Sequence, residues 1–144
     1  MSQTHFYEVN IQWKEARIGE LSSPVLNNTI ECATPPEFPN GVAGIWSPEH
    51  LFVSAINSCY MATFLAIAEN FKVEIEDFSC KTIAKLEMVD GKYLITQAEM
   101  FPIIKLTNPD KDTDKALRVV GKAKAGCLVT NSMKTEIILS PNIG

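Results

Sequence analysis

One long apolar segment, residues 48–70, constrains the fold of this chain more than any other feature, and it carries Cys59 near its middle. It opens with helix-start signals: Ser47 can cap the helix, Pro48 suits the first helical position, and Glu49 places a carboxylate in the first turn. Apolar side chains then recur on every side of the helix, which predicts burial on every side. We therefore expect Cys59 to lie inside the molecule or an assembly.

The composition predicts a single globular domain over residues 1–144, because 46% of the chain is hydrophobic and 21% is charged. A net charge of −4 argues against nucleic acid and membrane surfaces as partners. The long helix is interrupted by Asn57, Ser58, Thr63 and Glu69, so it is a poor membrane span.

Redox compartment and metal content can also be read from the composition. The start of the chain lacks a signal-peptide pattern, and the four cysteines form no CxxC pair. A cytoplasmic protein with mostly reduced thiols is the simplest expectation. His5 and His50 have no further ligand at a zinc-like spacing, so we expect neither metal nor cofactor.

Alternating apolar and polar residues predict strands on both sides of the helix. In the first strand, Val9, Ile11 and Trp13 share one face, which predicts a half-buried strand. Asp90-Gly91 is a strong hairpin signal. The expected strands are 6–13, 17–22, 28–33, 78–88, 92–106 and 134–140, with a second helix near 111–125. This order predicts an α+β fold with antiparallel sheets rather than alternating βαβ units.

The long helix needs more cover than one small sheet and one amphipathic helix supply. A second copy of the chain could supply it. We therefore expect an obligate homodimer with the long helices at its centre.

Two motifs resemble the OsmC/Ohr family of thiol peroxidases. The helix begins Pro-Glu-x-Leu with Cys59 ten residues after Glu49, and a second cysteine, Cys127, precedes the last strand. In the family this second cysteine opens a Cys-Pro-hydroxyl motif, whereas Leu128 replaces the proline here. The resemblance spans about residues 17–139. It implies an OsmC-like fold: antiparallel sheets around a long buried central helix, in an intertwined homodimer.

The resemblance also implies a chemistry. Cys59 would reduce an organic or lipid hydroperoxide and become a sulfenic acid, Cys127 would condense with it to a disulfide, and a lipoyl-type dithiol would restore both. Such a protein serves oxidative-stress defence. In the family an arginine from the N-terminal strands, bridged to the glutamate of the helix, activates the first cysteine. Arg17 with Glu49 would be that pair.

The residues themselves show why Cys59 needs help. A thiol attacks only as a thiolate, burial raises its pKa, and Cys59 lies too deep in its helix for the N-terminal dipole to act. Glu49 and Cys59 lie roughly 15 Å apart along the helix and on different faces. If both serve one site, the simplest arrangement brings them together from two chains, as two composite active sites.

Other interpretations remain open. Cys59 could be an inert buried thiol, Cys127 a turn residue, Glu49 a dipole-favouring acid and Arg17 a solvated strand residue. Cys32 and Cys80 fit structural roles. A non-catalytic protein that binds an apolar ligand at the dimer interface is the main alternative. A thioesterase-like enzyme with Glu49 as base is a third possibility.

Overall fold

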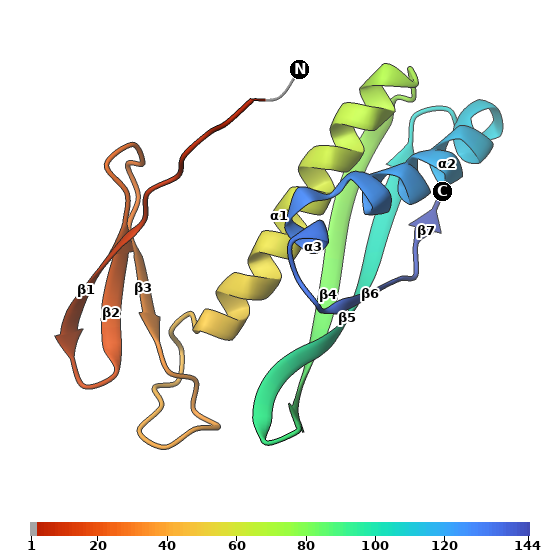
Figure 1. The fold of residues 1–144 in the computed structure, drawn as a ribbon. Helices are drawn as coiled ribbons and strands as arrows, with labels where there is room; N and C mark the ends of the chain where they lie inside the picture. The colour runs from red at the N-terminus through yellow and green to blue at the C-terminus, as the bar shows by residue number, and fades with distance from the viewer. Residues whose placement is uncertain (1–2) are drawn as a thin grey trace. The chain divides into compact units, whose positions relative to one another are not determined.

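The computed structural model describes residues 3–144 and divides the chain into two compact units, Met1–Phe52 and Val53–Gly144 (Figure 1). Each unit has its own sheet. Helix α1 (Pro48–Asn70) begins in the first unit and continues through the second. The expectation of a single domain over 1–144 stays a prediction.

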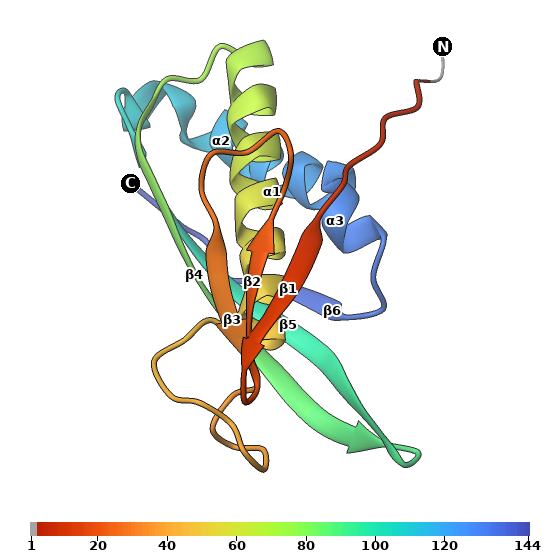
Figure 2. The same cartoon turned by 90° about the vertical axis from the view of Figure 1, so that its left-hand side faces the viewer.

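The first unit contains a three-stranded antiparallel sheet of β1 (Asn10–Glu15), β2 (Ile18–Ser22) and β3 (Ile30–Ala33), in the order β1-β2-β3 (Figure 2). The three expected strands are confirmed, but β1 begins four residues later than residue 6. The register explains this shift, because Asn10 pairs with Ser22, the last residue of β2. Residues 3–9 therefore have no partner strand.

One face of this sheet is apolar and exposed. The cross-strand row of Ile11, Leu21 and Ile30 places three apolar side chains side by side, with Trp13 in the next row. Ile11 is 65% exposed and Trp13 is 70% exposed. The prediction of a half-buried first strand is therefore wrong for the single chain, since all six residues of β1 are exposed.

Helix α1 has the predicted bounds, Pro48–Asn70, but its burial differs from the prediction. A single stripe is buried, one residue every four: Ile56, Tyr60, Phe64 and Ala68. Other apolar side chains of α1 face solvent in the single chain, with Met61 42% and Leu65 39% exposed. By length and composition alone α1 would also fit a membrane span, yet its buried stripe packs on a sheet.

The second unit is built on a long hairpin of β4 (Ile75–Val89) and β5 (Lys92–Leu106). The predicted turn at Asp90-Gly91 is confirmed, and both residues have positive φ, 50° and 80°, as a two-residue hairpin turn requires. On this sheet, Phe78 packs against the rings of α1. Its ring centroid lies 6.3 Å from that of Tyr60 and 5.3 Å from that of Phe64.

The chain then crosses back over the sheet through α2 (Pro109–Gly126) and the short α3 (Leu128–Asn131). It ends in β6 (Glu136–Leu139) and β7 (Asn142–Ile143), both parallel to β5. The predicted α+β fold is confirmed, and the first sheet and the β4–β5 hairpin are antiparallel as expected. The second sheet differs from the expectation in one respect: β6 and β7 make it mixed, and β5–α2–β6 is a crossover unit. The cause is the helical connection, which returns the chain to the end of the sheet where β5 began.

Candidate functional site

The second unit brings Cys59 and Cys127 together, although 68 positions separate them in the chain. Cys59 lies in the middle of α1, and Cys127 occupies the junction between α2 and α3. Figures 1 and 2 show α3 beside α1. The end of α2 meets α1 closely, since a Cβ at Gly126 would lie 3.7 Å from Cγ2 of Thr63. Both cysteines are free thiols, and the Cys127 side chain is hydrogen-bonded to the Cys59 sulfur.

The surroundings of Cys59 favour its thiolate. Burial raises the pKa of Cys59, but hydrogen bonds to the backbone of Val129, the Cys127 thiol, the Thr63 hydroxyl and the backbone of Leu128 outweigh that effect. The pKa of Cys59 therefore lies below its ordinary value. The Thr63 oxygen is 3.9 Å from the sulfur, one helical turn along α1. Hydrogen-bond donors thus act on Cys59 from within the second unit itself.

The backbone donor at Leu128 depends on the residue type at that position. Proline has no backbone N–H, so a Cys-Pro sequence could not donate from this position. Leucine restores the N–H, and the backbone of Leu128 contributes to lowering the pKa of Cys59. The departure from the Cys-Pro pattern therefore adds a hydrogen-bond donor to the surroundings of Cys59.

The junction that holds Cys127 is tied together by its own hydrogen bonds. The Thr130 hydroxyl donates to the Cys127 carbonyl (3.2 Å), and the Asn131 side-chain amide donates to the Ala125 carbonyl (3.0 Å). Cys127 is 0% exposed. These contacts hold the Cys127 backbone, and therefore its sulfur, next to Cys59.

Sequence reasoning missed Thr63, Leu128 and Val129 as parts of this site. Thr63 could have been found, because residues four apart on a helix share a face. The two backbone donors could not, because every residue except proline carries an N–H and only the folded junction aims these two at a sulfur.

The other two cysteines have different surroundings. Burial raises the pKa of Cys80, and hydrogen bonds to the Thr82 hydroxyl and the backbone of Phe101 do not offset it. Cys32 is buried at the centre of β3. Among residues 3–144, no group of three or more His, Cys, Asp or Glu side chains is placed to hold a metal ion.

Arg17 and Glu49 belong to the first unit. Arg17 is exposed at the β1–β2 turn, where Ala16 has a positive φ of 48°, and Glu49 is half-buried in the first turn of α1. Within the described part of the single chain, no ion pair joins these two side chains. Their role at Cys59 stays a prediction.

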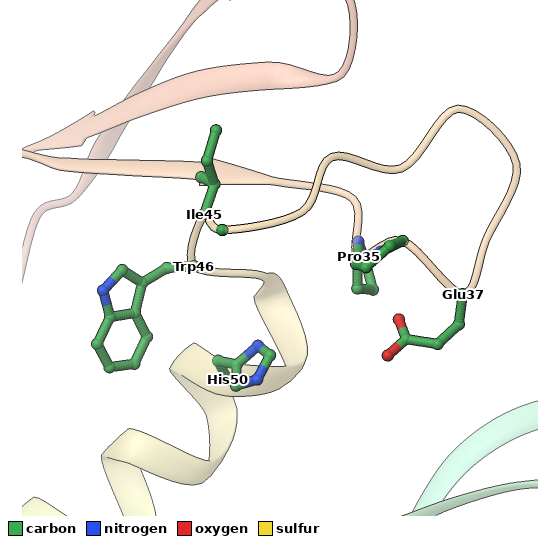
Figure 3. Close-up of a pocket in the computed structure, with 7 residues that line it drawn as sticks. Pro35, Glu37, Ile45, Trp46 and His50 are labelled. Carbon is green, nitrogen blue, oxygen red and sulfur yellow. The ribbon is translucent and has the colours of Figure 1, made fainter.

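The start of α1 also borders a pocket of about 400 Å³ within the first unit (Figure 3). The predicted cap is confirmed, because the Ser47 hydroxyl accepts a hydrogen bond from the backbone N–H of His50 at 3.1 Å. The same hydroxyl is also hydrogen-bonded to Nδ1 of the His50 side chain at 2.6 Å. The Trp46 and His50 rings meet edge to face, with centroids 6.2 Å apart. The other lining residues are Pro35, Pro36, Glu37, Gly44 and Ile45. Such a lining suits a small, largely apolar group.

The loop of this pocket depends on one glycine. A Cβ at Gly41 would lie 1.9 Å from the Pro35 carbonyl oxygen, so any larger residue would force the loop open. The turn is closed by hydrogen bonds from Phe38 N to Pro35 O (3.1 Å) and from Val42 N to Thr34 O (2.8 Å).

Comparison with known proteins agrees with this architecture. Residues 41–141 match the family model described as OsmC-like protein. Uncharacterized protein YmaD of Bacillus subtilis (strain 168) is 22% identical over 96% of this chain and 93% of its own length.

Two solved structures show the same fold. An OsmC-like protein of unknown function from Vibrio cholerae superposes with a TM-score of 0.86 at 21% identity, over 96% of this chain and 99% of that one. An organic hydroperoxide resistance protein OsmC from Legionella pneumophila superposes with a TM-score of 0.76 at 19% identity, over 99% of each chain. The family model covers most of the sequence, and the chain therefore belongs to the OsmC-like protein family.

Proposed function

We propose that this protein is a two-cysteine peroxidase that reduces organic hydroperoxides to alcohols and contributes to defence against oxidative stress. The observation that carries the proposal is the Cys59–Cys127 contact, in which the pKa of Cys59 is lowered by hydrogen bonds despite burial. The name of the Legionella relative, an organic hydroperoxide resistance protein, supports the substrate class.

The proposed reaction has two chemical steps and a recycling step. The Cys59 thiolate attacks the distal oxygen of the peroxide, the O–O bond breaks, and the alkoxide leaves and takes up a proton to give the alcohol. Cys59 is then a sulfenic acid, and the Cys127 sulfur attacks the Cys59 sulfur, forming the disulfide and releasing water. A dithiol reduces this disulfide by exchange, is itself oxidised to a disulfide, and returns a proton to each cysteine sulfur.

Arg17 and Glu49 enter the proposal through a homodimer. The exposed apolar side chains of Met61 and Leu65 on α1, and of Ile11 and Trp13 in the first sheet, support a second copy that covers them. In that assembly Arg17 and Glu49 would act on a Cys59 thiolate, because a guanidinium stays charged and favours the anionic form of a thiol.

The proposal is tested by intact mass analysis after one equivalent of cumene hydroperoxide, with thiol alkylation and peptide mapping. We expect a loss of two hydrogen atoms that maps to a Cys59–Cys127 disulfide and is absent from Cys59→Ser. Oxidation scattered over Cys32 and Cys80, or none at all, would contradict the proposal.

A second candidate function is supported by the pocket at the start of α1 (Figure 3): the binding of an apolar ligand without catalysis. Quenching of Trp46 fluorescence would report such binding, because this indole lines the pocket. This candidate would be favoured if an apolar ligand bound saturably with an affinity that Cys59→Ser does not change, and if the protein showed no peroxidase activity.

A further inference from the structure

Helix α2 concentrates positive charge in a protein whose net charge is −4. The acids of this helix, Asp110, Asp112 and Asp114, lie near its start. Between Lys115 and Thr135 the sequence contains five cations and no acid. Cys127 lies within this basic segment, so the proposed resolving cysteine has the most positive stretch of the chain around it.

Four of the cations of α2 form one line along the helix, which we call the α2 basic stripe: Lys111, Lys115, Arg118 and Lys122. Their spacing of four, three and four residues places them on one face. Lys115 is half-buried and the other three are exposed. Within residues 3–144, none of the four is ion-paired with a carboxylate.

The ordinary explanation of such charges is the helix dipole, which favours cations in the last turn. It accounts for Lys124 but not for Lys111 in the first turn or Lys115 and Arg118 in the middle. The stripe also lies on a different side of α2 from the buried Ala116, Val119 and Ala123, so it is not part of the face that α2 buries in the core.

The stripe runs along the helix that positions Cys127. Lys122 precedes Cys127 by five residues, a rise of roughly 7.5 Å, and the stripe from Lys111 to Lys122 is roughly 17 Å long. The ammonium of Lys122 lies 5.8 Å from the centre of the Phe71 ring at the end of α1. A small peroxide or dithiol is too short to contact the whole of a charged line of this length, whereas the surface of a protein can contact all of it.

We propose that the α2 basic stripe is the docking surface for a carrier protein that presents an acidic face and delivers the reducing dithiol. This inference rests on the proposed peroxidase cycle, which consumes one external dithiol per turnover. The carrier dithiol attacks the Cys59–Cys127 disulfide, passes through a mixed disulfide, and leaves as a disulfide, with both cysteines protonated again. Complementary charge accelerates such an encounter and makes it sensitive to salt.

Two synthetic peptides test the proposal, each carrying one dihydrolipoyl-lysine. Six Asp and Glu residues flank the lysine in the first peptide, and six Asn and Gln residues in the second. With the oxidised protein at low salt, we expect the acidic peptide to reduce the disulfide about tenfold faster, and the gap to close as salt screens the charges.

The matched variants remove three charges each. The stripe variant, which combines Lys115→Gln, Arg118→Gln and Lys122→Gln, should be reduced at the same rate by both peptides. The control variant combines Lys85→Gln, Lys92→Gln and Lys105→Gln on the β4–β5 hairpin and should still be reduced faster by the acidic peptide. Dithiothreitol, which is neutral, should reduce all three proteins at the same rate.

Equal rates for the two peptides, or an equal gap in the two triple variants, would overturn the docking proposal while the peroxidase cycle stands. If no Cys59–Cys127 disulfide forms at all, the cycle itself fails. In that case, fluorescence anisotropy of the labelled acidic peptide without its dithiol measures whether the stripe binds it. Equal affinity for the two triple variants would overturn the docking surface in that case as well.

Discussion

Both units of this chain have apolar residues at the spacing expected for one face of a helix or strand, but the two units bury these side chains to very different extents. In the second unit Tyr60, Phe64 and Met100 are each almost fully buried, whereas in the first unit Ile11 and Trp13 are mostly exposed. Alternation correctly predicts that Ile11 and Trp13 share a face. Periodicity therefore shows which side chains lie together, but not whether the same chain covers them.

The largest effect is expected at the cysteines of the second unit. Cys59→Ser should lower peroxide consumption at least about a thousandfold, because a hydroxyl at this position cannot replace the thiolate nucleophile. Cys80→Ser is the control, since burial raises the pKa of Cys80 and disfavours its thiolate. Consumption of cumene hydroperoxide measures both, and equal losses would contradict the assignment.

The contribution of the first unit to this chemistry can be separated by mixing chains. If the active sites are composite, a Cys59→Ser chain mixed with a Glu49→Ala chain should regain activity in heterodimers, because one of the two sites then has both residues. Mixtures as inactive as the two parents would count against composite sites.

Core packing gives the next largest contrast between the units. Ile56→Ala removes a fully buried side chain of the second unit and should cost about 2–5 kcal/mol of unfolding free energy. Val25→Ala, at a position of the first unit that is 86% exposed, should change it by less than about 0.5 kcal/mol. Urea denaturation measures both, and similar midpoints would show that the difference in burial has no energetic counterpart.

The exposed face of the first sheet is expected to matter for assembly rather than for folding. Ile11→Asp places a charge on the apolar face and should weaken the proposed homodimer at least about tenfold, since an unpaired charge is costly to bury. Gln12→Asp puts the same charge on the opposite face of β1 and should have little effect. Sedimentation across a dilution series distinguishes them, and a monomer in the unmodified protein would remove the homodimer from the proposal.

The smallest effect is expected at Leu128. Leu128→Pro deletes one N–H donor to Cys59 and should raise the pKa of Cys59, whereas Leu128→Ala keeps the donor. Cys127 has an extended backbone (φ −71°, ψ 106°), as the residue before a proline requires. The rate of Cys59 alkylation against pH should therefore shift to higher pH in Leu128→Pro, falling about three- to tenfold near neutral pH.

Above the pKa of Cys59 in both proteins, the thiol is fully ionised and the two alkylation rates should converge. A profile for Leu128→Pro that overlays that of Leu128→Ala would show that the Leu128 backbone does not act on the thiolate.

Several elements were predictable because their signals are local. Helix α1 begins and ends at the predicted residues, since a capping serine and a first-turn proline mark its start. The Asp90-Gly91 turn was equally clear, because few residue pairs adopt positive φ at two successive positions. The resemblance of the sequence to the OsmC/Ohr motifs also singled out Cys59 and Cys127 as candidate reactive residues.

The remaining features were decided by contacts between distant parts of the chain. The parallel pairing of β6 with β5 depends on where α2 and α3 return the chain, which no local pattern encodes. The residues themselves did not pair Cys59 with Cys127; the family resemblance implied that pair, and the α2–α3 junction brings the Cys127 side chain within hydrogen-bonding reach of Cys59.

The sequence by itself determined the helix, the hairpin and the reactive residue types, because capping, turn conformation and side-chain chemistry act within a few residues. Only the tertiary structure decided which backbone N–H groups reach Cys59 and which apolar faces stay open. Hydrogen-bond direction and burial depend on elements that meet only once the chain has folded.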